Sequence, residues 1–161
     1  MNTTSKIQTL AREIGFSLPD AYNASRLLWD NLEANGERPA VLTDGGNVTY
    51  RELVSEAARI GNQLIQADCK PGDRILLFLN DGPAYPAAIM GALRAGLVPV
   101  LLNTLTPPEM IRYCLEDSSA TAAIVSDEHE QLFMEKTIGG TACRSVLTAT
   151  EKPPWVVMSP E

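Results

Sequence analysis

Asn103 and Thr104 are the residues of this sequence whose position best suits ligand binding. They directly follow residues 97–102, an apolar run of strand length that should lie in a parallel sheet. Open α/β sheets bind ligands just beyond the carboxyl ends of their strands, so both residues are candidate substrate-binding residues. A turn or capping role explains the same two residues, and spacing alone favours that alternative.

One histidine, His129, is available for a Ser-His-Asp or Cys-His site. It stands in the segment DEHE at 127–130, the acidic first turn of an expected helix, where carboxylates suit the helix dipole. This setting predicts a solvated surface role. Glu116 and Asp117 are adjacent carboxylates, but adjacent residues of a helix point in different directions. We expect them to be a solvated helix end, and the sequence predicts no catalytic residue.

Phosphate-binding loops and metal sites are not apparent in the sequence. A phosphate loop needs glycines that lead into a helix, as in GxGxxG or GxxxxGKS/T, and neither motif occurs. The glycine pairs at 45–46 and 139–140 are predicted to form turns. The cysteines lie far apart and lack CxxC spacing, so reduced thiols are expected, with neither a zinc site nor a disulfide framework. They are Cys69, Cys114 and Cys143.

Composition limits the classes of partner. The 161 residues give room for one domain or for part of a larger one, and 45% apolar with 20% charged residues is typical of a globular protein. A formal net charge of -7 argues against nucleic acid and against an anionic membrane surface, because both recruit basic patches. Residues 1–18 lack the long apolar core of a secretory signal, so a cytoplasmic location is expected.

Residues 71–103 have the pattern of a parallel βαβ unit. The expected elements are a strand at 75–79, a helix at 84–95 and a second strand at 97–102. Gly96 can adopt the left-handed conformation that ends a helix. Pro99 cannot donate to a strand ladder, so the second strand should either begin irregularly or have one side unpaired there.

Two elements near the N-terminus are also expected. A helix over 23–34 should begin at an asparagine cap and pack through its leucines. The short runs at 39–42 and 48–49 should pair as an antiparallel hairpin, because a glycine-rich turn separates them.

A long helix should follow this hairpin. Thr49 and Glu52 have the spacing of a capping box, in which each side chain accepts a hydrogen bond from a backbone amide of the other residue. The apolar spacing along the helix places Ile65 on the core face. The same pattern places Glu56 and Arg59 on the solvent face.

The alternation of strands and helices continues toward the C-terminus. Thr106 should cap a helix with Pro107 in its first position. Strands are expected at 121–125 and 145–148, with a helix between them that Ser126 caps. Together these elements predict an α/β fold with a mostly parallel sheet, helices on its faces and a small N-terminal antiparallel hairpin.

The order of these motifs resembles the N-terminal region of the adenylate-forming acyl- and aryl-CoA ligases. The matching pieces are TYREL at the long helix, PGDRI before a strand, GALRAGLVPV in the βαβ unit, and TPPE followed by LEDSSATAAIVS. The resemblance covers about residues 24–147. Within the family, the piece LVPVLLNTLTPPEMIRYCLEDS is most similar to the benzoate-CoA ligase branch.

The resemblance implies a two-step reaction for a longer parent protein. A carboxylate attacks the α-phosphate of ATP to give an acyl-adenylate and pyrophosphate, and the thiol of CoA then displaces AMP. The parent would require ATP, Mg²⁺ and CoA, with benzoate or a related aromatic carboxylate as its substrate. The family's catalytic groups are implied to lie beyond Glu161, so no catalytic residue, cofactor or metal is assigned to this chain.

We therefore expect a fragment of a larger ligase N-terminal domain. Residues 1–22 would be an N-terminal extension, 23–150 the α/β subdomain, and 151–161 a truncated linker toward the phosphate-loop region. The fragment should be inactive alone, and its uncovered apolar faces or strand edges favour a homodimer. A free-standing scaffold or protein-interaction module with the same fold is the alternative. A free-standing nucleotide-binding protein is a third possibility, which the lack of a phosphate loop disfavours.

Overall fold

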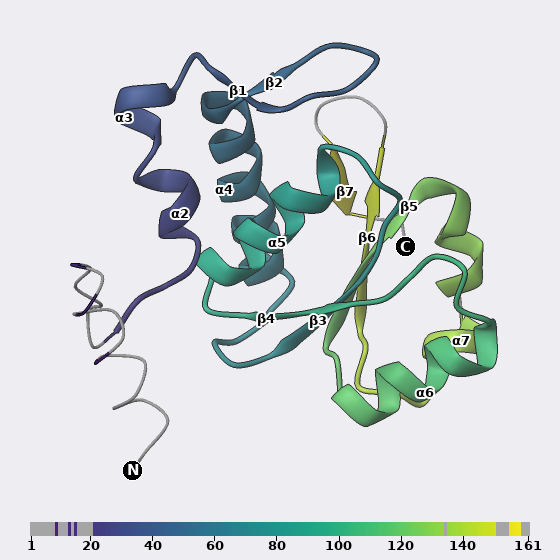
Figure 1. Ribbon diagram of the computed structural model, residues 1–161. Helices are drawn as coiled ribbons and strands as arrows, with labels where there is room; N and C mark the ends of the chain where they lie inside the picture. Colours follow the sequence, from purple (N-terminus) through teal and green to yellow (C-terminus); the bar gives the residue numbers. More distant parts are fainter. Residues whose placement is uncertain are drawn as a thin grey trace.

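The computed structural model describes residues 21–133, 135–150 and 155–158, together with Thr9, Glu13 and Gly15. Most of the expected N-terminal extension therefore lies outside the described residues. The chain folds into two sheets with helices packed around the larger one (Figure 1). In chain order the elements are α2 Arg26–Trp29, α3 Leu32–Asn35, β1 Pro39–Val41, β2 Val48–Thr49, α4 Tyr50–Gln66, β3 Arg74–Phe78, α5 Ala84–Arg94, β4 Val98–Leu101, α6 Pro108–Ser118, β5 Ala122–Ser126, the 3₁₀ helix η1 Asp127–Phe133, α7 Glu135–Ile138, β6 Ser145–Ala149 and β7 Val156–Met158.

The main sheet has the described strands in the order β4-β3-β5-β6-β7. β4, β3, β5 and β6 run parallel, and β7 pairs antiparallel with β6 at the edge. The expected α/β fold with a mostly parallel sheet is confirmed, and β1 and β2 form the expected antiparallel hairpin. β7 is a further strand that the sequence did not predict.

The predicted βαβ unit is confirmed as β3, α5 and β4. Gly96 has a φ of +78°, in the left-handed region, where the chain leaves α5 and turns into β4. β4 is an edge strand of the described sheet and pairs only with β3. One side of the strand is therefore unpaired at Pro99, as predicted.

Alternate side chains of the central strands enter two separate hydrophobic cores. Ile75 and Leu77 of β3 pack with α4 and α5, whereas Leu76 and Phe78 pack with α6 and η1. Figure 1 shows α4 and α5 on one face of the sheet and α6 and α7 on the other. Both faces of the strand are covered, which explains why its sequence is continuously apolar instead of alternating.

The capping box at the start of α4 is confirmed. The Glu52 amide donates to Thr49 Oγ1 at 3.2 Å, and the Thr49 amide donates to Glu52 Oε2 at 2.8 Å. Two other predictions for this helix are wrong. Ile65 is 54% exposed, because the neighbouring Leu64 fills the core position of the last turn. Glu56 is buried, because its carboxylate binds a backbone amide of the segment that leads into β7.

The single helix expected over 23–34 is replaced by two short helices, α2 and α3. The side-chain amide of Asn31 donates to the Leu27 carbonyl at 2.8 Å, and the Asn31 backbone amide bonds to Leu28 instead. An asparagine side chain that takes a backbone acceptor in this way competes with helix continuation. Leu27 consequently points outward and is 61% exposed, so the predicted packing through all the leucines is wrong.

Two predicted helix starts also differ from the structure. Ser126 does not cap a helix, because its Oγ accepts the amide of Asn80 at 2.9 Å. The following residues form η1 and then the short helix α7 in place of one α-helix. α6 begins one residue later than expected, since Pro107 precedes another proline and adopts an extended conformation, with a φ of -67° and a ψ of 154°.

Candidate functional site

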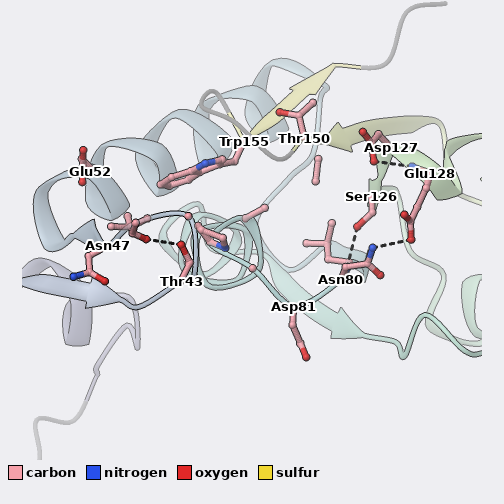
Figure 2. A pocket seen from close by; sticks show the side chains of 18 residues that line it. Thr43, Asn47, Glu52, Asn80, Asp81, Ser126, Asp127, Glu128, Thr150 and Trp155 are labelled. Atoms are coloured by element: carbon pink, nitrogen blue, oxygen red, sulfur yellow. Dashed lines mark hydrogen bonds between the residues drawn. The ribbon is translucent and has the colours of Figure 1, made fainter.

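A cleft of about 710 Å³ opens at the carboxyl ends of β3, β5 and β6 (Figure 2). The loops after these strands line it, together with the hairpin turn at 43–48 and Trp155. The chain continues from β3 to β4 on one side and from β5 to β6 on the other, so the boundary between β3 and β5 is a topological switch point. Open α/β sheets bind ligands at such points, which makes this cleft the candidate functional site.

Hydrogen bonds across the switch point fix the two loops that meet there. The Asn80 side-chain amide donates to Glu128 Oε1 at 2.8 Å, in addition to the bond from the Asn80 backbone to Ser126. The Glu128 amide in turn donates to Asp127 Oδ1 at 2.8 Å. Figure 2 shows these residues together on one side of the cleft. These hydrogen bonds connect the loop after β3 to the residues that follow β5.

The charge of the cleft restricts what it can hold. Its lining contains four carboxylates, and no lysine or arginine occurs among the described residues that line it. Hydrogen bonds from the backbone and hydroxyl of Thr49 lower the pKa of one of these carboxyl groups, that of Glu52. The four are Glu52, Asp81, Asp127 and Glu128. Phosphate groups require cations or converging amides, so this surface suits an uncharged part of a ligand better than a triphosphate.

Trp155 supplies an aromatic surface to the cleft. Its side chain is mostly buried and packs in the same core as α4 and α5, and Figure 2 shows the ring lying along α4. The apolar residues Val48, Leu79 and Ala149 also line the cleft. The combination of an indole ring with small apolar side chains is suited to packing against a planar, uncharged group.

The structure places Asn103 and Thr104 at a second, smaller hollow of about 370 Å³. Asn103 Oδ1 accepts the Leu105 amide at 2.7 Å, and its carbonyl accepts the Thr106 amide at 2.9 Å, which is the geometry of a turn. The hollow shares Asn80 and Asp81 with the main cleft. A substrate contact by Asn103 and Thr104 stays a prediction.

Asn80 and Asp81 line both the cleft and the smaller hollow, and they were not among the candidate residues identified from the sequence. They follow β3 as Asn103 follows β4, so the same rule of strand carboxyl ends could have identified them. The two loops lie together because β3 and β4 are adjacent parallel strands. The sequence therefore contained a signal for both residues.

The solvated role predicted for His129 is wrong. Its imidazole is 24% exposed and packs edge-on against the Phe78 ring, with centroids 5.0 Å apart and an interplanar angle of 67°. The expected α-helix would have directed this side chain outward, whereas the 3₁₀ turn brings it over the sheet. Glu116 and Asp117 are exposed as predicted, and Glu116 pairs with Arg112 at 2.9 Å.

The three cysteines are free thiols. Burial raises the pKa of Cys143 to about 11 and also raises that of Cys69. A raised pKa leaves the thiol protonated at neutral pH and removes its nucleophilic form. No group of three or more His, Cys, Asp or Glu side chains that could hold a metal ion occurs in the described part of the chain. The described helices also include none that is long and apolar enough to cross a membrane.

We expect Cys143 to resist alkylation in the folded protein. A pKa of about 11 leaves about 0.1% of the thiol ionised at pH 8. Treatment with iodoacetamide at pH 8, followed by peptide mass spectrometry, should modify the half-buried Cys114 well before Cys143. In guanidinium chloride the two rates should converge. Equal rates in the folded protein would show that Cys143 is not protected.

Comparison with known proteins identifies the family. The sequence model described as AMP-binding enzyme matches residues 28–157. Benzoate–CoA ligase of Thauera aromatica is 37% identical over 119 residues, which are 72% of this chain and 23% of the relative. The 4-hydroxybenzoate–CoA/benzoate–CoA ligase of Rhodopseudomonas palustris is 32% identical over 134 residues, which are 82% of this chain and 25% of the relative. The chain thus spans about a quarter of the length of the curated relatives it matches.

Solved structures have the same fold. A benzoate CoA ligase from Burkholderia xenovorans superposes with a TM-score of 0.74 at 33% identity, over 81% of this chain and 26% of that protein. An anthranilate CoA ligase, AuaEII, in complex with anthranoyl-AMP superposes with a TM-score of 0.76 at 28% identity, over 81% of this chain and 25% of that protein. The chain therefore belongs to the AMP-binding enzyme family, and it has the parallel sheet and hairpin of the N-terminal domain of its CoA ligases.

Proposed function

We propose that this chain is part of an aryl-CoA ligase that activates benzoate or a related aromatic carboxylate. In the first step a carboxylate oxygen attacks the α-phosphorus of ATP, the bond to pyrophosphate breaks, and an acyl-adenylate forms. In the second step the sulfur of CoA attacks the acyl carbon, AMP leaves with the electrons of the broken C–O bond, and the thiol proton is released. The aromatic carboxylates named for the two relatives support the choice of substrate.

The observation that carries this proposal is the cleft at the switch point, whose lining combines an indole ring and apolar side chains with four carboxylates and no described cation. A ligand site at this edge of the sheet fits a ligase domain, but the described lining has no cation to stabilise the transferring phosphorus. We infer that the chain supplies one side of a substrate site and that the phosphate-binding groups come from other parts of the protein. Magnesium would neutralise phosphate charge in this chemistry. The described residues include no group of three or more His, Cys, Asp or Glu side chains that could hold a metal ion, so none of them is given a role in binding it.

The test is thioester formation by the protein encoded by the whole reading frame that contains these residues. With ATP, Mg²⁺ and CoA, benzoate should give benzoyl-CoA and equimolar AMP, and kcat/KM for palmitate should be about 100-fold lower. Thr104→Val should raise the KM for benzoate, and an unchanged KM would remove Thr104 from the site. A preference for palmitate would contradict the aromatic substrate. No thioester from any carboxylate would contradict the ligase activity.

A further inference from the structure

Glu56 is an unusual residue in the core of this fold. Its side chain is 11% exposed, and it lies three residues after the buried Leu53 on the core stripe of α4. It is the one charged residue among the buried side chains of the described chain. A buried carboxylate is retained only where charge and hydrogen bonds compensate for lost hydration, so its partners indicate what it does.

The partners of Glu56 come from its own helix and from the residue that leads into β7. Its Oε2 accepts Arg59 Nε at 3.0 Å, and its Oε1 accepts the backbone amide of Trp155 at 2.7 Å. Arg59 Nη2 donates both to the same carboxylate and to the carbonyl of Val156. One turn of α4 therefore provides an acceptor to Trp155 and a donor to Val156, the first residue of β7.

These bonds determine where Trp155 lies. The Trp155 amide is held by Glu56, and its carbonyl accepts the Thr150 amide at 2.7 Å. Val156 then pairs with Ala149 as the first residue of β7. Apolar burial alone is not directional, whereas these hydrogen bonds specify the direction of the backbone and with it the placement of the indole ring. The ring lines the cleft next to Ala149 and Thr150.

We propose that Glu56 and Arg59 are positioning residues for the cleft: they hold Trp155 where its ring can pack against the planar aromatic group of a ligand. The role in ligand binding rests on the proposed ligase function, whereas the placement of Trp155 does not. Two ligands of a CoA ligase have a planar ring, the aromatic carboxylate and the adenine of ATP. The charge of the cleft allows either ring but disfavours close approach of the anionic groups.

Trp155 can be observed directly in the 161-residue chain. The sequence has two tryptophans, so Trp29→Phe leaves Trp155 as the only indole fluorophore. In this background Glu56→Ala should shift the emission to longer wavelength and accelerate hydrogen exchange of the Trp155 amide about tenfold. Glu56→Gln keeps the side-chain volume and one oxygen acceptor, so it should restore most of the exchange protection.

Glu116→Ala is the matched control, because it removes a carboxylate from an exposed pair with an arginine on α6. Both signals should stay at their original values in this variant. If Glu56→Ala does not fold, the same two measurements are made on Arg59→Met. This variant keeps the apolar stem of the side chain and removes the donor to Val156. Unchanged emission and unchanged Trp155 exchange in Glu56→Ala, or in Arg59→Met as its substitute, would overturn the proposal.

The ligase assay distinguishes failure of the proposed ligase function from failure of the proposed role of Trp155 in ligand binding. In the protein encoded by the whole reading frame, Glu56→Ala should raise the KM for benzoate about fivefold and change kcat by less than about twofold, whereas Glu56→Gln should keep the KM near its original value. A rise in the KM for ATP instead would assign the ring to adenine. Unchanged KM values for Glu56→Ala in an active ligase would overturn the role in ligand binding. If the unmodified protein forms no thioester, the proposed function fails, while the fluorescence and exchange measurements still decide the placement of Trp155.

Discussion

Replacing Gly91 with alanine is expected to destabilise the fold by about 3 kcal/mol, because α4 and α5 cross at this residue with their backbones in contact. A Cβ at Gly91 would lie 2.5 Å from the Ala57 carbonyl oxygen and 3.2 Å from the amide nitrogen of Gly61. These atoms belong to the backbone of α4 and cannot move aside as a side-chain end could. Alanine is the better helix former by about 1 kcal/mol, but this gain is smaller than the cost of separating the helices.

Gly82→Ala is the matched control for this variant. A Cβ at Gly82 would meet no atom within 4 Å, and the residue has no positive φ. Urea unfolding followed by circular dichroism should give a lower midpoint for Gly91→Ala and a change within about 0.5 kcal/mol for Gly82→Ala. Equal midpoints for the two variants would show that the close approach of α4 and α5 is absent in solution.

Phe78→Ala should lower the free energy of unfolding by about 4 kcal/mol, since it would leave a cavity in the core that β3 forms with α6 and η1. The ring is fully buried, with the Phe133 ring centroid at 5.3 Å and the His129 imidazole centroid at 5.0 Å. Because His129 follows Glu128 directly, loss of this packing should also loosen the side of the cleft that Asn80 and Glu128 form.

Tyr113→Ala is the control for the loss of an aromatic ring, because Tyr113 is 57% exposed on α6. The same urea titration should leave this variant within about 0.5 kcal/mol of the original protein. If Phe78→Ala were as stable as Tyr113→Ala, the placement of η1 over the sheet would be wrong.

The parts of the fold that could be predicted are those whose causes lie within a few residues. A continuous apolar run identified β3, and a glycine after a helix identified the left-handed turn at Gly96. The Thr49 and Glu52 capping box is likewise a contact over three residues. In each case the physical requirement and the residue that meets it are neighbours in the chain, so the pattern is visible in the sequence.

The parts that could not be predicted depend on distant partners. The spacing pattern of the helix placed Glu56 on the solvent face, and the amide that makes its burial possible lies 99 residues further on. Ser126 had the features of a helix cap, but Asn80, 46 residues earlier, uses its oxygen. The cleft shows the same limit, since Asn80 and Glu128 face each other only after β3 and β5 have paired.

The central proposal is that the described residues form one side of a ligase site and that the phosphate-transferring groups come from other parts of the protein. The most direct test is to measure thioester formation with benzoate, ATP, Mg²⁺ and CoA, side by side for residues 1–161 and for the protein encoded by the whole reading frame. We expect benzoyl-CoA from the latter only, with any rate for residues 1–161 at least about 1,000-fold lower. Robust turnover by residues 1–161 alone would contradict the proposal.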